Sequence, residues 1–458
     1  MTLRPTRQEG ESTDQWQPDP SILPEGWGLK RLKYVSQINS SSVDKKSREG
    51  ETEVELCNYT EVYNNEVIDR SFDFLDATAG DHEIQRFKLR EGDILFTKDS
   101  EDWTDIGVPA FIAEDLPGVI CGYHLFHCCP NEDLVLPKYL FWALKSRYVA
   151  FQLEGAATGV TRYGLTMQDV ANTWIPHPPK EVQSKIADFL DQQTNCLDAI
   201  IKRNSELLEL LNEKRITEIY YDCFGRRGDQ ILKETSTDWA PKIPDYWFET
   251  RLKFVSNEII DCEHKTAPND PDGDFFIIKT SNVRDGKLLL EDAEKTNEEV
   301  YKEWTQRGEP KPGDIIFTRE APVGEVGIVP EGENVLLGQR TVLIRPDRSQ
   351  ITTNYLSYML QNPSIEWYSE LMSQGSTVPH LNVSDIKDLP VFLPPIEERK
   401  DIVKRLNEID HKITLAYNNI ENSINLHQEK RRALITDAVT GQINLKQTEL
   451  SYSQEEIA

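Results

Sequence analysis

The chain repeats itself at a distance of about 220 residues, and this duplication restricts its fold more than any other feature of the sequence. The matching segments, in chain order, are Pro24–Ser36 with Pro244–Ser256, GDILFT at Gly92–Thr97 with GDIIFT at Gly313–Thr318, Pro178-Pro179 with Pro394-Pro395, and Glu213–Arg215 with Glu429–Arg431. The offset begins at 220 and 221 and falls to 216 at the end of the copy. Because chance matches do not keep their order, the chain consists of two copies of one unit with small differences in loop length.

Each copy has a β-rich part followed by a long helix. Runs of β-branched and aromatic residues bounded by Gly or Pro predict strands, and they lie at Asp93–Thr97, Val119–Cys129, Phe275–Thr280, Asp314–Thr318 and Val335–Arg345. A helical segment follows each Pro-Pro pair and ends near Gly225 or Gly441, since Pro favours the approach to a helix and Gly its end. A helix of about 40 residues is about 60 Å long.

Residues recur every seven positions along both helical segments, in two interleaved series typical of a coiled-coil seam. We expect helix pairing through Ile186, Leu190, Leu197, Ile200, Asn204, Leu207 and Leu211 of the first helix and Ile402, Leu406, Ile409, Ile413, Ile420 and His427 of the second. The polar residues Asn204 and His427 interrupt one series, and Gln193 and Ser423 the other. Either these residues are solvated, or they are buried and fix the register and antiparallel direction of the helices.

These features predict an α+β fold with internal pseudo-two-fold symmetry and an antiparallel helix pair. We expect a disordered tail at 1–20, a β-rich domain at 21–179, a long helix at 180–225, a linker at 226–241, a second β-rich domain at 242–395, a second long helix at 396–445 and a disordered tail at 446–458.

Composition excludes several classes of protein. The 38% hydrophobic content and nine Trp indicate a folded chain, and no run of 18 apolar residues exists to form a membrane span. Met1–Pro20 lack the apolar core of a secretory signal. The seven Cys are an odd number without CxxC spacing, which favours reduced thiols in the cytoplasm.

Catalytic signatures are almost absent from the sequence. It contains no GxxxxGK[ST] loop, GxGxxG fingerprint, HExxH, GxSxG or NPPY-type tetrapeptide. Asp272, Asp285 and Lys287 match the PD…DxK order of a metal-dependent nuclease. That pattern is short, Asp272 falls in a turn-like segment and the first copy has no counterpart, so we interpret these residues as ordinary loop charges.

A second cluster contains residue types that bind zinc, namely Cys121, His124, His127, Cys128 and Cys129. The second copy carries Leu337, Arg340, Leu343, Ile344 and Arg345 at these positions. We therefore expect buried strand thiols and no metal site in this chain. The same alignment pairs His124 with Arg340, each two residues after a Gly, which indicates a binding surface.

The duplicated order of β-rich part, Pro-Pro and long helix resembles the specificity (S) subunit of type I DNA restriction-modification systems. The resemblance extends from about Ile22 to Leu445. It includes NEKRITEIYYDCFG and QEKRRALITDAVTGQI at the helix ends, and LNVSDIKDLPVFLPPIEERKDIVKRL with its looser counterpart LTMQDVANTWIPHPPKEVQSKIADFL. No single motif is diagnostic, but their order and duplication are specific.

The resemblance implies a non-catalytic subunit that reads double-stranded DNA. Each β-rich part would be a target recognition domain for one half of a split sequence, and the paired helices would be a spacer that docks two methyltransferase subunits. A restriction translocase subunit would join the complex. Cofactors are implied only in those partners: S-adenosylmethionine, ATP and Mg. Because the two domains differ, the target is expected to be bipartite and asymmetric.

Base reading requires donors and acceptors on loops that reach the major groove, and phosphate contacts require basic or hydroxyl groups. In the first domain the candidates are Lys98, Ser100, His124, Thr161, Arg162 and Tyr163. In the second they are Lys279, Thr280, Ser281, Asn282, Arg319, Gln339, Arg340, Ser376, Thr377 and His380. For any single candidate the alternative is an ordinary loop residue.

Two other functions compete with DNA recognition: a divergent nuclease or methyltransferase, and a coiled-coil scaffold that binds only protein. The net charge of −27 excludes DNA binding through bulk positive charge. Segments 21–179 and 242–395 each carry a net charge of −10, with 15 basic against 25 acidic residues and 16 against 26. Acid-poor stretches occur at Leu134–Gln168 and Phe275–Leu290. We expect DNA to meet such small faces, and the isolated chain to bind DNA weakly. An acidic surface would also suit a high-salt cytoplasm.

Overall fold

The computed structural model describes residues 20–237, 242–362, 364–365, 368 and 380–443. The two expected tails lie outside these residues, apart from Pro20. The chain divides into two compact units: residues 1–204 with 422–458, and residues 205–421. Each unit therefore contains one β-rich domain, the beginning of the long helix that follows it and the end of the other long helix.

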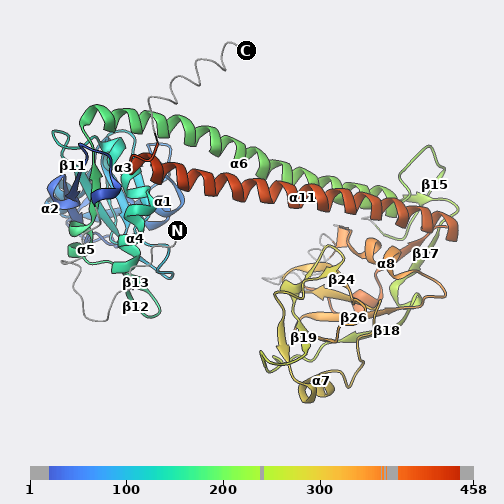
Figure 1. Ribbon diagram of the computed structural model, residues 1–458. Coiled ribbons are helices and arrows are strands. Elements are labelled where there is room, and N and C mark those ends of the chain that lie inside the picture. The colour runs from blue at the N-terminus through green and yellow to red at the C-terminus, as the bar shows by residue number, and fades with distance from the viewer. Residues whose placement is uncertain (1–19, 238–241, 363, 366–367, 369–379, 444–458) are drawn as a thin grey trace, which may run out of the picture. The chain divides into compact units, whose positions relative to one another are not determined.

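The first β-rich domain is built on two larger sheets (Figure 1). The five-stranded sheet has the order β2 (Ser36–Ser40), β11 (Leu125–Pro130), β7 (Ile94–Thr97), β9 (Pro109–Ile112), β4 (Val67–Ile68), and the four-stranded sheet the order β5 (Leu75–Ala79), β3 (Thr52–Cys57), β10 (Leu116–Cys121), β6 (Lys88–Leu89). Smaller sheets join β12 (Thr158–Gly159), β13 (Tyr163–Gly164) and β8 (Asp99–Ser100), and β1 (Gly28–Arg31) with β14 (Trp174–His177). Its helices are α1 (Tyr59–Asn64), α2 (Asp81–Phe87), α3 (Pro137–Lys145), α4 (Arg147–Ala156) and α5 (Met167–Asn172).

The second β-rich domain repeats the centre of this topology. The order β18 (Ser256–Asp261), β26 (Thr341–Pro346), β23 (Ile315–Arg319), β24 (Val323–Ile328) corresponds to β2-β11-β7-β9, and the order β22 (Glu294–Thr296), β19 (Phe275–Ile278), β25 (Val335–Leu337) to β5-β3-β10. Pairs β17 (Phe248–Arg251) with β27 (Pro390–Leu393), β15 (Leu232–Glu234) with β16 (Lys242–Pro244), and β20 (Val283–Arg284) with β21 (Lys287–Leu288) complete the strands. The helices include α7 (Glu298–Trp304), α8 (Thr353–Leu360) and α10 (Val383–Lys387).

Two runs that we expected to be single strands are each broken at a glycine. Val119–Cys129 divides into the end of β10 and most of β11, and Val335–Arg345 divides into β25 and most of β26. The Gly122 N–H donates to the Cys57 carbonyl at 2.9 Å, and the Gly338 N–H donates to the Ile278 carbonyl at 2.8 Å. A Cβ on either glycine would lie under 3.0 Å from that carbonyl oxygen. This close approach requires Gly and sends the chain from one sheet into the other.

The long helices are α6 (Lys180–Cys223) and α11 (Ile396–Val439), of 44 residues each. Both follow a Pro-Pro pair and end just before Gly225 and Gly441, which have φ of +60° and +73°. A Cβ at Gly225 would lie 2.4 Å from the Pro244 ring, and one at Gly441 would lie 2.3 Å from the Pro24 ring. The αL conformation and the close packing both demand Gly. Among the described residues, no helix is both long and apolar enough to cross a membrane.

Within each unit, α6 and α11 lie side by side and antiparallel (Figure 1). Four hydrogen-bonded pairs show the antiparallel direction, because the residue number rises along α6 while it falls along α11. The pairs are Asp198 with Arg431, Asn204 with Ser423, Arg215 with Asp410 and Asp222 with Arg405. The Asn204 amide donates to the Ser423 hydroxyl at 3.2 Å, and His427 Nδ1 donates to the Ser423 carbonyl at 2.6 Å. Three of the polar residues that interrupt the expected seam therefore meet each other.

One of the two expected heptad series in α6 begins correctly with the buried Ile186, but its later positions are wrong by one residue. Ile200 and Leu207 are exposed, whereas their neighbours Ile201 and Leu208 are half-buried and Thr194 is buried. The other series, with Leu190, Leu197, Asn204 and Leu211, is buried or half-buried, as are the expected positions of α11. The pairs Ile200-Ile201 and Leu207-Leu208 fit either phase of the heptad, so periodicity alone does not choose between them.

Equivalent aromatic residues of α3 and α8 contact a strand of their own domain and one of the long helices. The Tyr139 hydroxyl donates to the Pro176 carbonyl, and the Tyr355 hydroxyl donates to the Phe392 carbonyl, each at 2.8 Å. On the same helices α3 and α8, Trp142 donates to Asp191 and Tyr358 to Asn407, again at 2.8 Å. Apolar residues of both long helices complete each domain core; they include Ile186, Leu190, Ile435 and Val439 in one unit and Ile219, Cys223, Ile402 and Leu406 in the other.

Candidate nucleic-acid interface

The residue after each GDI[LI]FT strand has the same backbone partners in both domains. The Lys98 N–H donates to the His124 carbonyl, and the Leu165 N–H donates to the Lys98 carbonyl, each at 2.9 Å. The Arg319 N–H donates to the Arg340 carbonyl, and the Leu381 N–H donates to the Arg319 carbonyl, each at 2.9 Å. The equivalence of His124 with Arg340 is therefore confirmed, although both lie in the turn between two strands and not on a strand.

In the first domain, Asp99 joins the basic candidates. Its carboxylate contacts His124 Nδ1 at 2.8 Å and accepts from Arg162 Nε at 2.9 Å. The Arg162 side chain is 57% exposed, so its guanidinium remains accessible from solvent. Pairing of Tyr163 with Ser100 holds the β12-β13 hairpin beside β8. The structure thus brings together candidates that are far apart in the sequence, such as Lys98 and Arg162, which are separated by 64 residues.

Aromatic side chains border this first cluster. Lys98 Nζ lies 5.1 Å from the Tyr123 ring centroid, and the Tyr123 ring meets the His124 ring edge-on at 4.9 Å. Tyr59 and Tyr63 stack at 5.3 Å, and the hydrogen bond from Tyr63 to Asp105 raises the pKa of Tyr63 to about 12. Tyr123 is exposed, as are Thr161 and the neighbouring Trp103. Such rings supply apolar contacts and cation–π partners beside the basic groups.

In the second domain, Glu320 occupies the place of Asp99. Its carboxylate lies 3.4 Å from Arg340 Nε, and its backbone forms a bridge with His380. Arg340 is 52% exposed and has φ +68°, and Gln339 beside it is also exposed. The Arg319 side chain is less exposed than that of Arg340, and its Nε lies 4.0 Å from Asp261 Oδ1. Sequence reasoning missed Asp99 and Glu320, although Lys98-Asp99 and Arg319-Glu320 are a visible basic–acidic pair after the same motif.

Lys279 lies next to this second cluster because Gly338 packs on the backbone of Ile278 and Lys279. Its ammonium group pairs with Glu294 at 2.5 Å. Thr280 and Ser281 form a short 3-10 turn with Asn282, and Ser281 is exposed there. Lys279, Thr280 and Ser281 can therefore present polar groups beside Gln339 and Arg340.

Two of the candidates have side chains that the fold already uses. Asn282 is 3% exposed; its side chain accepts from the Lys279 N–H at 3.1 Å and donates to the Leu289 carbonyl at 3.4 Å. Ser100 is 8% exposed and accepts from the Asp102 N–H at 3.2 Å. Both polar groups stabilise turns in this structure, and direct DNA contact by these two side chains stays a prediction. Ser376 and Thr377 lie outside the described residues.

The nuclease pattern also acquires a structural explanation. Asp285 lies in the turn between β20 and β21, where its carboxylate accepts from Arg215 of α6 at 2.9 Å. Asp272 is exposed in the loop before β19, and Lys287 lies on β21. Asp285 is thus an ion-pair partner that attaches the domain to the helices.

The sequence profile described as "Type I restriction modification DNA specificity domain" matches residues 24–210 and 261–426, more than half of the chain. The chain belongs to this family. Its two matched regions follow the duplication described above, and the chain is a specificity subunit with two DNA target recognition domains joined by paired long helices.

Individual relatives agree with this assignment. The specificity subunit of the type I restriction enzyme EcoBI from Escherichia coli is 26% identical over 286 residues, which cover 61% of this chain and 60% of that protein. The MjaIX specificity subunit of Methanocaldococcus jannaschii is 21% identical over 448 residues, covering 94% and 96%. A solved chain from a study of complex assembly and conformational transition in a type I R-M system shares the fold, with TM-score 0.59, 20% identity and coverage of 92% and 99%.

Proposed function

We propose that the two target recognition domains read the two unlike halves of a bipartite, asymmetric sequence in double-stranded DNA. The observation that carries the proposal is that one backbone frame presents different side chains in the two domains. The first presents Lys98, His124 and Arg162 around Asp99. The second presents Arg319 and Arg340 beside Glu320. Different donors on the same frame are expected to select different bases.

The acidic residue in each cluster has a role in this proposal. Asp99 holds His124 and Arg162 in position, and Glu320 lies beside Arg340, in the absence of DNA. A phosphate or a guanine edge competes with the carboxylate for the basic group. A carboxylate so released can accept from cytosine N4 or repel a phosphate that is wrongly placed. Each acid thereby favours a correct site over a wrong one.

We propose further that the chain is non-catalytic and acts only with partner subunits in the cytoplasm. The names of its relatives describe specificity subunits of type I restriction enzymes, which supports assembly with two methyltransferase subunits and a restriction translocase. S-adenosylmethionine, ATP and Mg then belong to those partners. The exposed faces of α6 and α11 are the proposed docking surfaces for the methyltransferases.

The test is methylome sequencing of the host with the gene intact and deleted. The expected result is the loss of one bipartite methylated motif with two unlike halves. A second host carries the clustered substitutions Lys98→Ala and Arg162→Ala, which we expect to alter or abolish recognition of one half only. An unchanged methylome after deletion contradicts the proposal and favours a protein-only scaffold. Modification or cleavage of DNA by the purified chain alone favours a divergent enzyme.

A further inference from the structure

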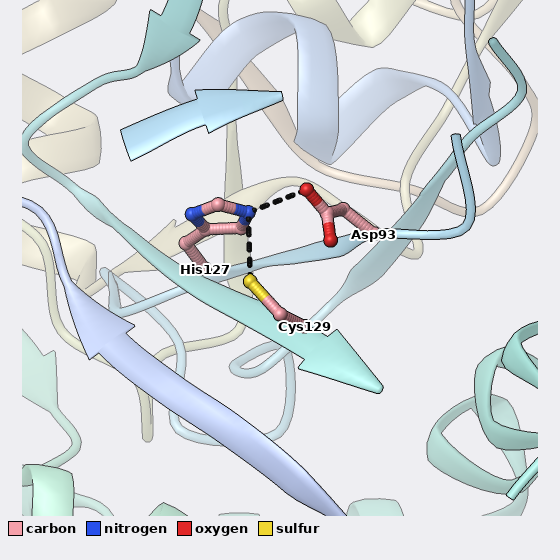
Figure 2. Close-up of side chains that lie close together, drawn as sticks. All are labelled: Asp93, His127 and Cys129. Carbon is pink, nitrogen blue, oxygen red and sulfur yellow. Dashed lines mark hydrogen bonds and ion pairs between the residues drawn. The ribbon is translucent and has the colours of Figure 1, made fainter. Parts of the chain in front are cut away.

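Three side chains of different chemistry converge at the start of β7, at the opposite end of that strand from Lys98. His127 Nε2 lies 2.9 Å from an Asp93 carboxylate oxygen and 3.3 Å from the Cys129 sulfur. The three candidate ligand atoms all lie within 4.8 Å of one another. Figure 2 shows that the same ring nitrogen faces both the carboxylate and the thiol.

The strand pairing explains this convergence. His127 and Cys129 are two residues apart on β11, so their side chains leave the same face of the sheet. β11 pairs with β7, and Asp93 immediately precedes β7. Asp93 and His127 are buried, and Cys129 is half-buried, which leaves one side of the cluster open.

The second domain has a buried carboxylate at the same position, but a different side chain balances its charge. Asp314 is the counterpart of Asp93, and each carboxylate accepts from a backbone N–H three residues earlier, at 2.9 Å and 3.0 Å respectively. Arg345, the counterpart of Cys129, donates to Asp314 through Nε at 3.2 Å and Nη2 at 2.8 Å. Leu343 takes the place of His127. A buried carboxylate is thus neutralised by a guanidinium in the second domain, and that guanidinium is replaced by imidazole and thiol in the first.

Nearby basic side chains do not account for this difference. Arg90 lies close enough to act on the Cys129 thiol, but its counterpart in the second copy is also basic, Lys311. Only the second domain adds Arg345 to that arrangement. The first domain instead offers one nitrogen, one oxygen and one sulfur, each of which is a ligand type that Zn²⁺ accepts.

The spacing of the ligands suits a tetrahedral ion. With Zn–N and Zn–O near 2.0 Å and Zn–S near 2.3 Å, tetrahedral coordination separates nitrogen from oxygen by about 3.3 Å and nitrogen from sulfur by about 3.5 Å. The observed separations are 2.9 Å and 3.3 Å, and the Asp93 oxygen and Cys129 sulfur lie within 4.8 Å of each other, so an ion requires the ligands to move by at most about 1 Å. Cys129 would release its thiol proton to solvent on binding. Water would take the fourth position on the half-buried side.

We propose that Asp93, His127 and Cys129 form a zinc site in the first target recognition domain only, where the ion replaces the Arg345 guanidinium of the second. Its role is structural, because it ties β7 to β11 at the end of the sheet remote from the candidate DNA interface. The expectation from sequence that this chain holds no metal is revised by this proposal. It does not depend on the DNA target or on the partner subunits.

The test is Co²⁺ titration of the purified full-length chain, treated first with chelator, followed by competition with Zn²⁺. We expect one equivalent of Co²⁺ to give ligand-field bands and a thiolate-to-cobalt charge-transfer band, both removed by Zn²⁺. We also expect Zn²⁺ to raise the thermal unfolding midpoint. If the native chain shows no charge-transfer band, the proposal is overturned, and the three residues then form only a hydrogen-bonded network.

The matched variants reproduce the second domain. The double substitution His127→Leu and Cys129→Arg is expected to fold through an Arg–Asp93 pair and to weaken Zn²⁺ binding at least tenfold. The single substitution Cys129→Ser should remove the charge-transfer band without a change of shape. Cys196→Ala alters an exposed thiol on α6 and should retain the band. A band that persists in Cys129→Ser, or that disappears in Cys196→Ala, places the metal elsewhere and overturns the assignment.

Discussion

At the scale of single residues, each candidate DNA interface contains an acid paired with basic side chains, two at Asp99 and one at Glu320. Asp99 and Glu320 follow directly after Lys98 and Arg319, and each contacts the basic residue of the neighbouring turn. Restrained basic groups lose less conformational entropy when they bind a base or phosphate. The local charge arrangement therefore matters more here than the total charge of the chain.

Arg340→Ala should weaken binding to the specific duplex roughly 5- to 150-fold, the equivalent of about 1–3 kcal/mol for one good base contact. Alanine also carries a Cβ, so the positive φ at this position remains equally unfavourable in the variant. The measurement is the dissociation constant of the assembled complex at fixed salt. Arg348→Ala is the matched control, because Arg348 is also exposed but contacts Pro312 at the other end of β23. An equal loss in both variants, or unchanged affinity and methylation with Arg340→Ala, contradicts the assignment.

Glu325→Gln should stabilise the second unit at pH 7 by at most about 1 kcal/mol, since solvent screens a half-buried group. Burial and the negative charge of Asp285 raise the pKa of Glu325, so its ionised form is less favourable in the fold than in the unfolded chain. That penalty is present above the folded pKa and disappears below about pH 4, where the carboxyl is protonated in both states.

Denaturation midpoints at pH 7 and at acid pH measure this difference. Glu331→Gln, on an exposed turn, serves as the control. If the stability gained by Glu325→Gln increases as the pH falls, the explanation is contradicted.

At the scale of secondary-structure elements, the repeated Glu-Lys-Arg motif is a clamp between domain and helices. Arg215 of α6 donates to Asp410 of α11 and to Asp285 of the domain, each at 2.9 Å. Arg431 of α11 donates to Glu66 of the other domain at 2.6 Å and to Asp198 of α6 at 3.0 Å. The motif thus joins three elements in each unit, which the sequence repeat alone does not reveal.

Arg215→Ala should lower the stability of the chain by about 2–3 kcal/mol, because two carboxylates and the Gln361 amide lose their shared donor. The loss of stability stays below the maximum for breaking a fully buried ion pair, because the Asp285 side chain is 53% exposed. Chemical denaturation followed by circular dichroism measures the shift. Lys214→Ala removes the exposed neighbour in the same motif and should change stability by less than about 0.5 kcal/mol. Similar losses in the two variants contradict the clamp.

At the scale of the whole molecule, the charge of −27 opposes DNA binding except at the candidate clusters. The balance of 51 basic against 78 acidic residues repels the phosphate backbone over most of the surface. We propose that partner subunits with basic surfaces supply most of the phosphate contacts, while the loops of this chain supply selectivity.

The isolated chain should therefore bind its specific duplex weakly at physiological salt, and much more tightly in complex with methyltransferase. Salt titration checks this expectation, because the slope of log K against log salt counts the phosphates neutralised. We expect a shallow slope for the chain alone and a steep one for the complex. Tight, specific binding by the chain alone contradicts this division of labour.

The sequence alone was sufficient to predict the duplication, the equivalence of His124 with Arg340, and the long helices, which follow Pro-Pro and end before Gly225 and Gly441. These features depend on local conformational propensity and on the order of residues along the chain, both of which are present in the linear sequence. Only the tertiary structure decided that Ile201 and Leu208 face inward and not Ile200 and Leu207, and that Asn282 is buried. It alone brought Asp93 to His127 and Cys129, because contacts between distant segments depend on strand pairing and packing, which local patterns do not encode.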